Sequence, residues 1–367
     1  MTALAAAIAA RIARDGPISV EGFMRACLAD PQHGYYAGAR IAARIGGEGD
    51  FITAPEISQV FGELIGLWAA ETWRQLGAPP TLRLVELGPG RGTLMADALR
   101  AIGAVAPAFR AALRVHLVEI SPVLRATQAR ALAAAEPAWH DSFDQVPRGP
   151  LIVIANEFFD ALPVRQFVRN GAVWRERVVA LAEGRLALAP GPVVEDPPLE
   201  PAHRDAPDGA IVEVCADGRA IAAALGARVA RDGGVALLID YGPAESAPGD
   251  SLQALRRHRH VDALAAPGEA DVTAHVDFAA LARAAGGTGA VVCGPIPQGT
   301  FLTRLGIVAR TAALVARAAP EQRRLLATGT QRLIDPAHMG TLFKTLALIA
   351  PGVGAPPGFD DPAEGRA

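Results

Sequence analysis

The sequence predicts an α/β fold with a mostly parallel central sheet. Continuous apolar runs at 82–87, 114–120, 151–157 and 234–242 have the length and composition of buried strands. Segments with helical patterns follow the first two runs, and this alternation indicates a parallel sheet covered by helices on both faces. A glycine-rich turn at 88–92 follows the first run directly, as at the ligand-binding edge of such sheets.

Helices and one long loop are expected before the first strand. Residues 2–14 and about 18–29 predict two short helices, which the sequence Asp-Gly-Pro separates. Residues 31–55 are rich in glycine and have no clean period, which is typical of a long covering loop. Apolar residues recur at helical spacing over 56–76. We therefore expect residues 1–80 to form N-terminal helices and a loop that covers a cofactor.

The strand–helix alternation is interrupted after the third apolar run. Alternating segments around Arg-Asn-Gly and Ala-Glu-Gly predict β-hairpins at 163–209, inserted into the α/β domain. The Rossmann-like core is then expected at 81–162 and 210–295. Residues 296–351 predict a C-terminal helical region on the substrate side, and the composition of 352–367 predicts a flexible tail.

The last third of the chain completes the prediction. We expect a polar loop at 243–276, a helix near 276–286 and a strand near 289–293. Helical patterns continue from about 298 to 331. The apolar stretch 341–351 fits either a strand or a helix.

Composition excludes several classes of function. Of the 367 residues, 51% are hydrophobic and 20% are charged, which is enough for a packed core. The net charge of -3 disfavours a nucleic-acid binder. The three cysteines are far apart and form no metal-binding motif, so we expect no metal and a reducing compartment, the bacterial cytoplasm. No apolar run is long enough for membrane insertion.

The spacing of the glycines indicates the ligand class. Gly88, Gly90 and Gly92 alternate, whereas a dinucleotide motif would need a third glycine at Thr93. Glu86 has the wrong charge for a pyrophosphate but suits the ammonium group of a methionine moiety. An acidic residue followed by alternate glycines is typical of enzymes that use S-adenosylmethionine.

The next two strands supply further cofactor candidates. Glu119 ends the second apolar run, where a carboxylate can accept hydrogen bonds from both hydroxyls of a ribose. The alternative is a solvated glutamate at a strand end. Asp141 and Ser142 fall where a third strand should end and could hold an adenine, although a plain loop explains them nearly as well.

Seven stretches, which span nearly the whole chain in order, match one known family. They are 49–66 (GDFITAPEISQVFGELIG), 86–94 (ELGPGRGTL), 118–125 (VEISPVLR), 155–167 (ANEFFDALPVRQF), 240–242 (DYG), 271–278 (DVTAHVDF) and 339–347 (MGTLFKTLA). The chain resembles the mitochondrial complex I assembly factor methyltransferases, the MidA-like proteins, and their bacterial relatives. One small departure is Ile52, where the family often has a hydroxyl residue.

The resemblance implies a fold, a cofactor and an activity. The fold is that of class I S-adenosylmethionine-dependent methyltransferases, with an N-terminal helical extension and an inserted antiparallel subdomain. The activity is methylation of a protein arginine, known for the mitochondrial members acting on a complex I subunit. The cofactor residues that carry over are Glu86, Gly88, Gly90, Gly92 and Glu119.

Three polar residues after the third apolar run are the catalytic candidates. Ligands of such sheets bind beyond the carboxyl ends of the strands, so Asn156, Glu157 and Asp160 should face the methyl group. Asn156 could orient the nucleophile, and the two acids could hold a guanidinium and draw off its proton. Alternatively, Asp160 caps the following turn and Glu157 pairs with an arginine.

The long N-terminal loop and one histidine are candidates for a lid and a substrate cleft. Asp50, Thr53 and Glu56 could cover the cofactor, although Thr53 and Glu56 also have the spacing of a helix capping box. His275 could line the cleft.

The sequence leaves two other functions and the oligomeric state undecided. A non-catalytic assembly chaperone could bind the methyl donor only for rigidity, and an NAD-dependent oxidoreductase would need a different glycine pattern. The expected partner is a protein substrate, and the apolar segments at 298–318 could contribute to a homodimer.

Overall fold

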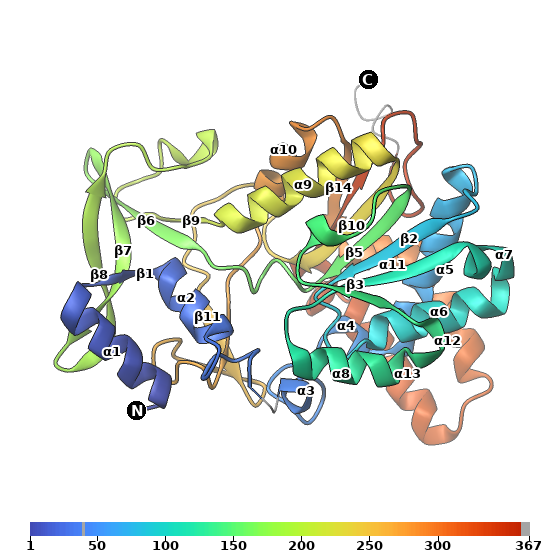
Figure 1. The fold of residues 1–367 in the computed structure, drawn as a ribbon, viewed down its shortest axis with the longest axis horizontal. Helices are drawn as coiled ribbons and strands as arrows, with labels where there is room; N and C mark the ends of the chain where they lie inside the picture. The colour runs from blue at the N-terminus through green and yellow to red at the C-terminus, as the bar shows by residue number, and fades with distance from the viewer. Residues whose placement is uncertain (39–40, 361–367) are drawn as a thin grey trace.

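A seven-stranded sheet forms the centre of the molecule (Figure 1). The computed structural model describes residues 1–38 and 41–360. The strand order is β14-β15-β10-β5-β2-β3-β4. Neighbouring strands from β10 to β4 are parallel, whereas β15 runs antiparallel to both of its neighbours, β10 and β14. The strands are β2 (Leu82–Leu87), β3 (Leu113–Val118), β4 (Ala138–His140), β5 (Leu151–Asn156), β10 (Gly234–Tyr241), β14 (Val291–Pro297) and β15 (Phe343–Ile349). The four apolar runs in the sequence are therefore confirmed as β2, β3, β5 and β10.

Both faces of this sheet are buried, which explains why its strands are apolar throughout. In β5, Ile152 and Ile154 pack into the core on one face, while Leu151, Val153 and Ala155 pack into the core on the other. The first face is covered by α5 (Gln59–Gln75), α6 (Thr93–Val105) and α11 (Gln298–Arg304). The second is covered by α9 (Ala216–Asp232) and α10 (Phe278–Gly286).

The order of the strands creates a switch point beside β2. From β2 the chain moves outward through β3 and β4, and then returns to place β5 on the other side of β2. The helices α6, α7 (Pro107–Ala112) and α8 (Pro122–Ala131) connect the strands of the first half. Connections that leave β2 and β5 in opposite directions open a crevice at the carboxyl ends of these strands, where such folds bind ligands.

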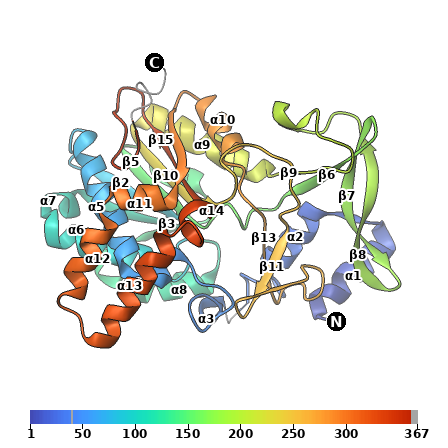
Figure 2. The ribbon, with the colours of Figure 1, turned by 180° about the vertical axis from the view of Figure 1, so that it is seen from behind.

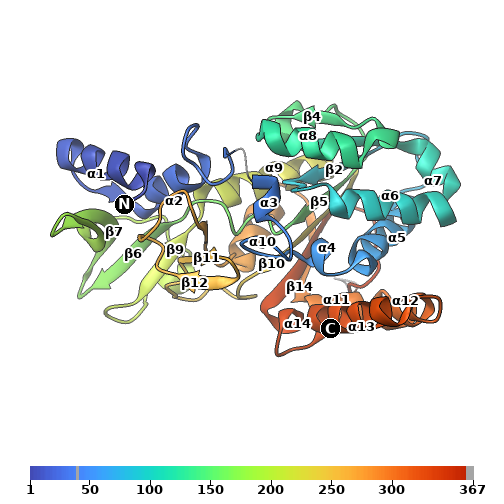
Figure 3. The ribbon, with the colours of Figure 1, turned by 90° about the horizontal axis from the view of Figure 1, so that it is seen from below.

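A second lobe lies beside the central sheet (Figures 1 and 3). Its antiparallel sheet has the order β1-β7-β6-β9, with β8 paired to β7. The hairpins turn at Gly171 and Gly184, both with positive φ, as the Asn-Gly and Glu-Gly sequences predict. The lobe contains α1 (Ala3–Asp15), α2 (Val20–Ala29), β1 (Ile18–Ser19), β6 (Arg165–Asn170), β7 (Val173–Ala182), β8 (Arg185–Val194) and β9 (Ile211–Val214).

The second lobe is larger than the insertion expected at 163–209. Strand β9 lies beyond that range, and β1 comes from the N-terminal region. The segment 243–276, expected as a polar loop, contains the three-stranded sheet β12-β11-β13, formed by β11 (Gln253–Arg256), β12 (Arg259–Val261) and β13 (Asp271–Thr273). These short strands have too little periodicity to be recognised in the sequence.

Other elements differ from expectation in detail. The helix expected at 56–76 is interrupted at Ser58, whose extended backbone separates α4 (Ala54–Ile57) from α5. The loop at 31–55 contains α3 (Ile41–Arg44). The alternative left open at 341–351 is settled as strand β15, and the segment 296–351 supplies this central strand as well as helices.

The C-terminal helices form a layer against the first face of the sheet (Figures 2 and 3). Helices α12 (Ile307–Val315) and α13 (Pro320–Ile334) pack together, and α14 (Met339–Leu342) leads into β15. Within the described residues, no helix combines the length and the apolar character that a membrane span needs.

The first residues of the tail expected at 352–367 are packed against the core. Trp68 Nε1 donates a hydrogen bond to the carbonyl of Pro357, and the rings of Phe301 and Phe359 lie 5.3 Å apart. These contacts hold the described part, 352–360, in place; residues 361–367 lie outside the described residues.

Candidate functional site

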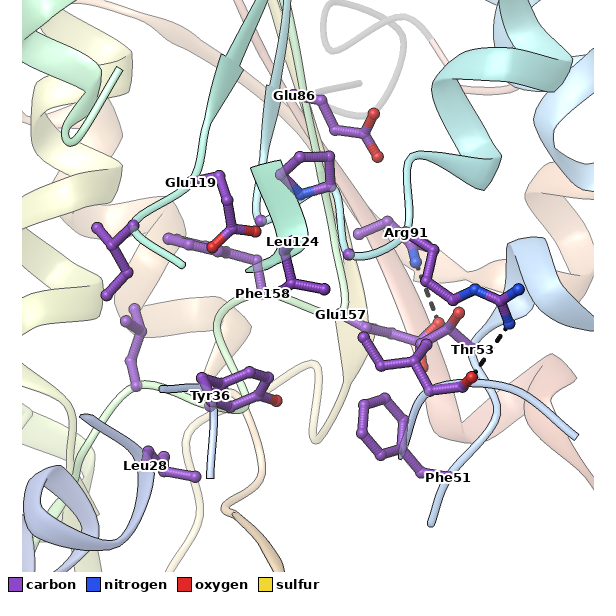
Figure 4. A pocket seen from close by; sticks show the side chains of 18 of the residues that line it. Leu28, Tyr36, Phe51, Thr53, Glu86, Arg91, Glu119, Leu124, Glu157 and Phe158 are labelled. Atoms are coloured by element: carbon purple, nitrogen blue, oxygen red, sulfur yellow. Dashed lines mark hydrogen bonds between the residues drawn. The ribbon is translucent and has the colours of Figure 1, made fainter. Parts of the chain in front are cut away.

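A cavity of about 330 Å³ opens at the carboxyl ends of β2, β3 and β5 (Figure 4). Strand ends and the turns after them supply one side, with Glu86, Glu119 and Glu157 among the lining residues. The second lobe and the N-terminal segment supply the opposite side, where Figure 4 shows Tyr36 and Phe51. The cavity thus lies at the switch point of the sheet and between the two lobes.

The glycine turn requires glycine because of its backbone conformation. Gly88, Gly90 and Gly92 have φ values of +61°, +53° and +83°, a region that side chains with a Cβ rarely adopt. At Gly88 a Cβ would also lie 2.9 Å from the Phe158 ring. Gly92 is the N-cap of α6, so the free N–H groups of the helix begin beside the cavity. Gly88 and Gly90 line the cavity, as do Thr93 and Leu94 at the start of α6. Gly92 itself does not line it, and its contact with the cofactor stays a prediction. The turn therefore presents bare backbone and a helix N-terminus to a ligand.

Glu86 is a buried acid without a partner. Its side chain is 3% exposed, and its Oε2 atom has no hydrogen bond with the described residues. Burial raises the pKa of Glu86 to about 8. A buried polar atom without a partner is costly, so this carboxyl fits a site for a cationic ligand group such as an ammonium.

Glu119 is held firmly at the end of β3. Its Oε1 accepts a hydrogen bond from the backbone N–H of Ser121 at 2.8 Å, and its Oε2 accepts one from Gln128 Nε2 at 3.2 Å. Gln128 also donates to the carbonyl of Gly90 at 2.8 Å, which ties this strand end to the glycine turn. Burial raises the pKa of Glu119, and the hydrogen bonds it accepts oppose that change. The remaining acceptor capacity of the carboxylate suits the hydroxyls of a ribose.

Asn156 and Glu157 lie together at the end of β5. Glu157 Oε1 accepts hydrogen bonds from the backbone N–H of Ala54 at 2.8 Å and from Asn156 Nδ2 at 3.0 Å. Glu157 Oε2 accepts none from the described residues, and neither does the buried Oδ1 of Asn156. Burial raises the pKa of Glu157 to about 8. Both residues line the cavity, and each has one side-chain oxygen that accepts no hydrogen bond from the described residues.

Asp160, expected beside Glu157, does not line the cavity. It is 8% exposed and lies near the carboxylates of Asp240 and Asp271 and the phenol of Tyr241. Burial raises its pKa to about 6. The turn after β5 directs Glu157 and Asp160 to different surroundings, so the structure does not support the two acids acting as a pair.

The N-terminal segment covers part of the cavity. Thr53 and Glu56 line the cavity, and Thr53 makes no capping hydrogen bond, so the capping box suggested by the sequence is absent. Glu56 instead accepts hydrogen bonds from Thr93 Oγ1 at 2.6 Å and from Arg91 at 3.5 Å. These contacts attach the covering segment to the start of α6.

Asp50 supports the covering segment from outside the cavity. Its carboxylate accepts hydrogen bonds from Tyr35 Oη at 3.0 Å and from the backbone N–H of Arg257 at 3.0 Å. Asp50 is buried and does not line the cavity. Its position connects the segment to the β11–β12 hairpin.

Three other candidates lie away from the cavity. Asp141 is exposed and forms an ion pair with Arg125 at 2.6 Å, and Ser142 is exposed beside it. Neither residue lines the cavity, and a role for them at an adenine stays a prediction. His275 is exposed and packs edge-on against Tyr241, so the expectation that it lines this cleft is not met.

Several lining residues were not anticipated from the sequence. They come mostly from the second lobe and from the turns next to the strand ends, and include Arg25, Leu28, Tyr36, Phe51, Arg91 and Phe158. Tyr36 donates a hydrogen bond from its hydroxyl to Asp271 at 3.1 Å. Arg91 and Phe158 reach the cavity from the turns after β2 and β5. The other four have no local pattern that distinguishes them from core residues, because the docking of the N-terminal segment and second lobe brings them to the cavity.

Comparisons with known proteins agree on one family. Residues 64–296 match the family model of S-adenosyl-L-methionine-dependent methyltransferases. The chain is 38% identical to the mitochondrial protein arginine methyltransferase NDUFAF7 homolog of Drosophila melanogaster, over 95% of this chain and 85% of that protein. It is 37% identical to the mitochondrial protein arginine methyltransferase NDUFAF7 of Homo sapiens, over 92% and 81%.

A solved structure shares the fold. A crystal structure from Burkholderia thailandensis, bound to S-adenosyl-homocysteine, has a TM-score of 0.81 and 31% sequence identity. The match covers 97% of this chain and 94% of that one. A native structure from the same organism has a TM-score of 0.78. The similarity therefore includes both lobes.

Proposed function

The chain belongs to this family of S-adenosylmethionine-dependent methyltransferases, and on that premise we propose that it methylates an arginine side chain of a protein. The related proteins in Drosophila melanogaster and Homo sapiens are named protein arginine methyltransferases. The observation on which the proposal depends is Oε2 of Glu157, a residue that lines the cavity, because this atom accepts no hydrogen bond from the described residues. The buried Oδ1 of the neighbouring Asn156 accepts none from them either.

The residues around the cavity fit the methyl donor. The unpartnered Glu86 carboxyl would hold the ammonium group, Glu119 would accept the ribose hydroxyls, and the glycine turn would lie against the ligand. When bound, S-adenosylmethionine supplies a methyl group on a sulfonium, which is activated toward direct attack by a nucleophile. The chain must then align the acceptor and exclude water.

Glu157 and Asn156 have the chemistry to hold a guanidinium. A carboxylate oxygen and an amide oxygen both accept hydrogen bonds, and a guanidinium has only donors to offer. Oε1 of Glu157 is already fixed by two donors, so Oε2 has a defined position for a substrate N–H. The apolar side chains of Leu28, Phe51 and Leu162 could surround the aliphatic part of an arginine.

The pKa of Glu157 makes this step dependent on pH. With a pKa of about 8 the carboxyl is mostly neutral at pH 7, and an approaching guanidinium would favour its ionised form. The ionised carboxylate can then attract the proton that the guanidinium nitrogen loses after methyl transfer.

A labelling experiment tests the proposal. The full chain, radiolabelled S-adenosylmethionine and a cell extract are incubated, and labelled proteins are hydrolysed to identify the methylated amino acid. We expect a labelled band that contains methylarginine, strongly reduced by Glu157→Gln and unchanged by Glu71→Gln, an exposed control. Methylation of another amino acid would contradict the arginine acceptor.

The same assay separates the alternatives. Binding of S-adenosyl-homocysteine without any labelled protein would support a non-catalytic assembly chaperone. A nicotinamide dinucleotide that binds where S-adenosyl-homocysteine does not would support an oxidoreductase. A complex I subunit is the first purified acceptor to try, following the resemblance, and a homodimer through 298–318 stays a prediction.

A further inference from the structure

Asp240 makes an unusual set of contacts at the end of β10. Its side chain is completely buried. Its Oδ2 accepts hydrogen bonds from the backbone N–H groups of Phe158, Phe159 and Asp160, at 3.1, 2.9 and 3.2 Å. Its Oδ1 accepts one from the N–H of Tyr241 at 2.9 Å. One carboxylate therefore binds three successive N–H groups of the turn at 157–160, which directly follows β5.

This turn determines where the Glu157 side chain lies. The strands β5 and β10 are parallel, with Asn156 beside Ile239, so Glu157 and Asp240 follow at the same edge of the sheet. Glu157 donates its N–H to the carbonyl of Ile239 at 2.8 Å and has a φ of +50°, which is uncommon for a residue with a side chain. Such a backbone persists only when its surroundings hold it. On its C-terminal side, Asp240 accepts three N–H groups of the turn, and the carbonyl of Asp160 accepts a further bond from the N–H of Ala274.

A carboxyl group fits this position better than an amide. Both oxygen atoms of Asp240 face N–H donors, so the amide of an asparagine would place its NH₂ group against at least one of them. The opposite residue in the sheet, Lys344, does not satisfy the carboxylate, because its Nζ donates to the carbonyls of Thr341, Leu342 and Gly242. The hydrogen-bonding capacity of Asp240 is thus used for backbone N–H groups, mainly those of the turn.

We propose that Asp240 is a positioning residue for methyl transfer, because its hold on the turn at 157–160 keeps the Glu157 carboxylate in the cavity. Asp240 does not line the cavity, so it would act on the reaction from outside it. It acts through Glu157, so the inference rests on the proposed role of Glu157 in the reaction.

Hydrogen exchange tests the hold on the turn without any enzyme assay. In the full-length Asp240→Asn variant, we expect amide exchange of the segment 157–161 to rise at least tenfold. Asp232→Asn is the matched control. Asp232 also has a buried side chain, but it lies beside the opposite end of β10, where it forms an ion pair with Arg228. Its substitution should leave exchange at 157–161 at the wild-type level. Unchanged exchange in Asp240→Asn would overturn the proposal whether or not the protein is active.

A double-substitution cycle tests the link to Glu157. At saturating methyl donor, we expect Asp240→Asn to lower the rate of methyl transfer to the extract proteins by about 10- to 100-fold. This is the loss expected when a catalytic group is displaced by about 1 Å. Affinity for S-adenosyl-homocysteine should fall by less than the transfer rate, because Glu86 lies in β2 and Glu119 directly after β3, outside the turn at 157–160.

The combined variant distinguishes a positioning role from a general loss of stability. If Asp240 acts through Glu157, adding Asp240→Asn to Glu157→Gln should produce little further loss of rate. Equal losses in both backgrounds would refute the positioning role. A wild-type protein that labels no acceptor would refute the proposed function, and the exchange measurement would still decide whether Asp240 holds the turn.

Discussion

Replacing Glu86 by glutamine should weaken donor binding while it stabilises the free protein at high pH. The carboxyl is 3% exposed, and its Oε2 atom lacks a partner in the part of the chain that the structure describes. Burial raises its pKa from 4.5 to about 8. The folded chain therefore binds a proton here more tightly than the unfolded chain does. A carboxyl of this kind costs no stability below pH 4.5 and costs increasingly more as the pH rises toward 8.

The magnitude follows from the two pKa values. Each unit of difference corresponds to about 1.4 kcal/mol, so the cost is on the order of 3 kcal/mol at pH 7 and 5 kcal/mol above pH 8. Glutamine has the same shape but cannot ionise, so the variant avoids this cost. Loss of a charged hydrogen bond to the donor's ammonium should weaken binding by about 1.5–3 kcal/mol, roughly 10- to 150-fold.

Two measurements check this prediction. Denaturant unfolding of both proteins should show that the stability gain of Glu86→Gln grows by about 3 kcal/mol between about pH 5.5 and about pH 8.5. Calorimetry with S-adenosyl-homocysteine at pH 7, in buffers of different ionisation enthalpy, should show that the wild-type protein releases about one proton more than the variant.

Either of two results would refute the reasoning. A stability difference that does not change with pH would mean that Glu86 titrates normally. Undiminished affinity of Glu86→Gln for S-adenosyl-homocysteine would mean that this carboxyl does not hold the ammonium group. Glu71→Gln, on the exposed surface, should change neither quantity.

Three further predictions concern the turn, the acceptor and the covering segment. Gly88→Ala should lower stability by about 1–2 kcal/mol and weaken binding of S-adenosyl-homocysteine, because φ is +61° and the Phe158 ring is 2.9 Å from the new Cβ. Gly103→Ala in helix α6, where the new Cβ has free space and φ is not positive, is the control. It should stabilise the protein by about 0.4–1 kcal/mol in denaturant unfolding. The kcat/KM for the acceptor should rise with pH to a plateau above about 8, because the pKa of Glu157 is about 8. Glu157→Gln should remove this inflection. An unchanged profile would exclude Glu157 as the group that takes up the proton. Added S-adenosyl-homocysteine should protect residues 45–56 from protease, and equal cleavage rates would contradict a covering role.

The sequence predicted the parts of the site that depend on local structure. Long apolar runs identified β2 and β5, because strands buried on both faces need apolar residues at every position. The alternate glycines marked the turn, because their positive φ values are a property of a few consecutive residues.

The tertiary structure decided which of these residues meet. Glu157 and Asp160 are three residues apart in one motif, yet only Glu157 lines the cavity, because the turn held by Asp240 directs their side chains differently. Tyr36 reaches the cavity from the second lobe, whereas His275 packs outside it. The sequence alone determined the strands β2, β3, β5 and β10, the glycine turn and the acids at the strand ends. Only the packing of distant segments decided which side chains share the cavity, because such contacts leave no periodic pattern in the chain.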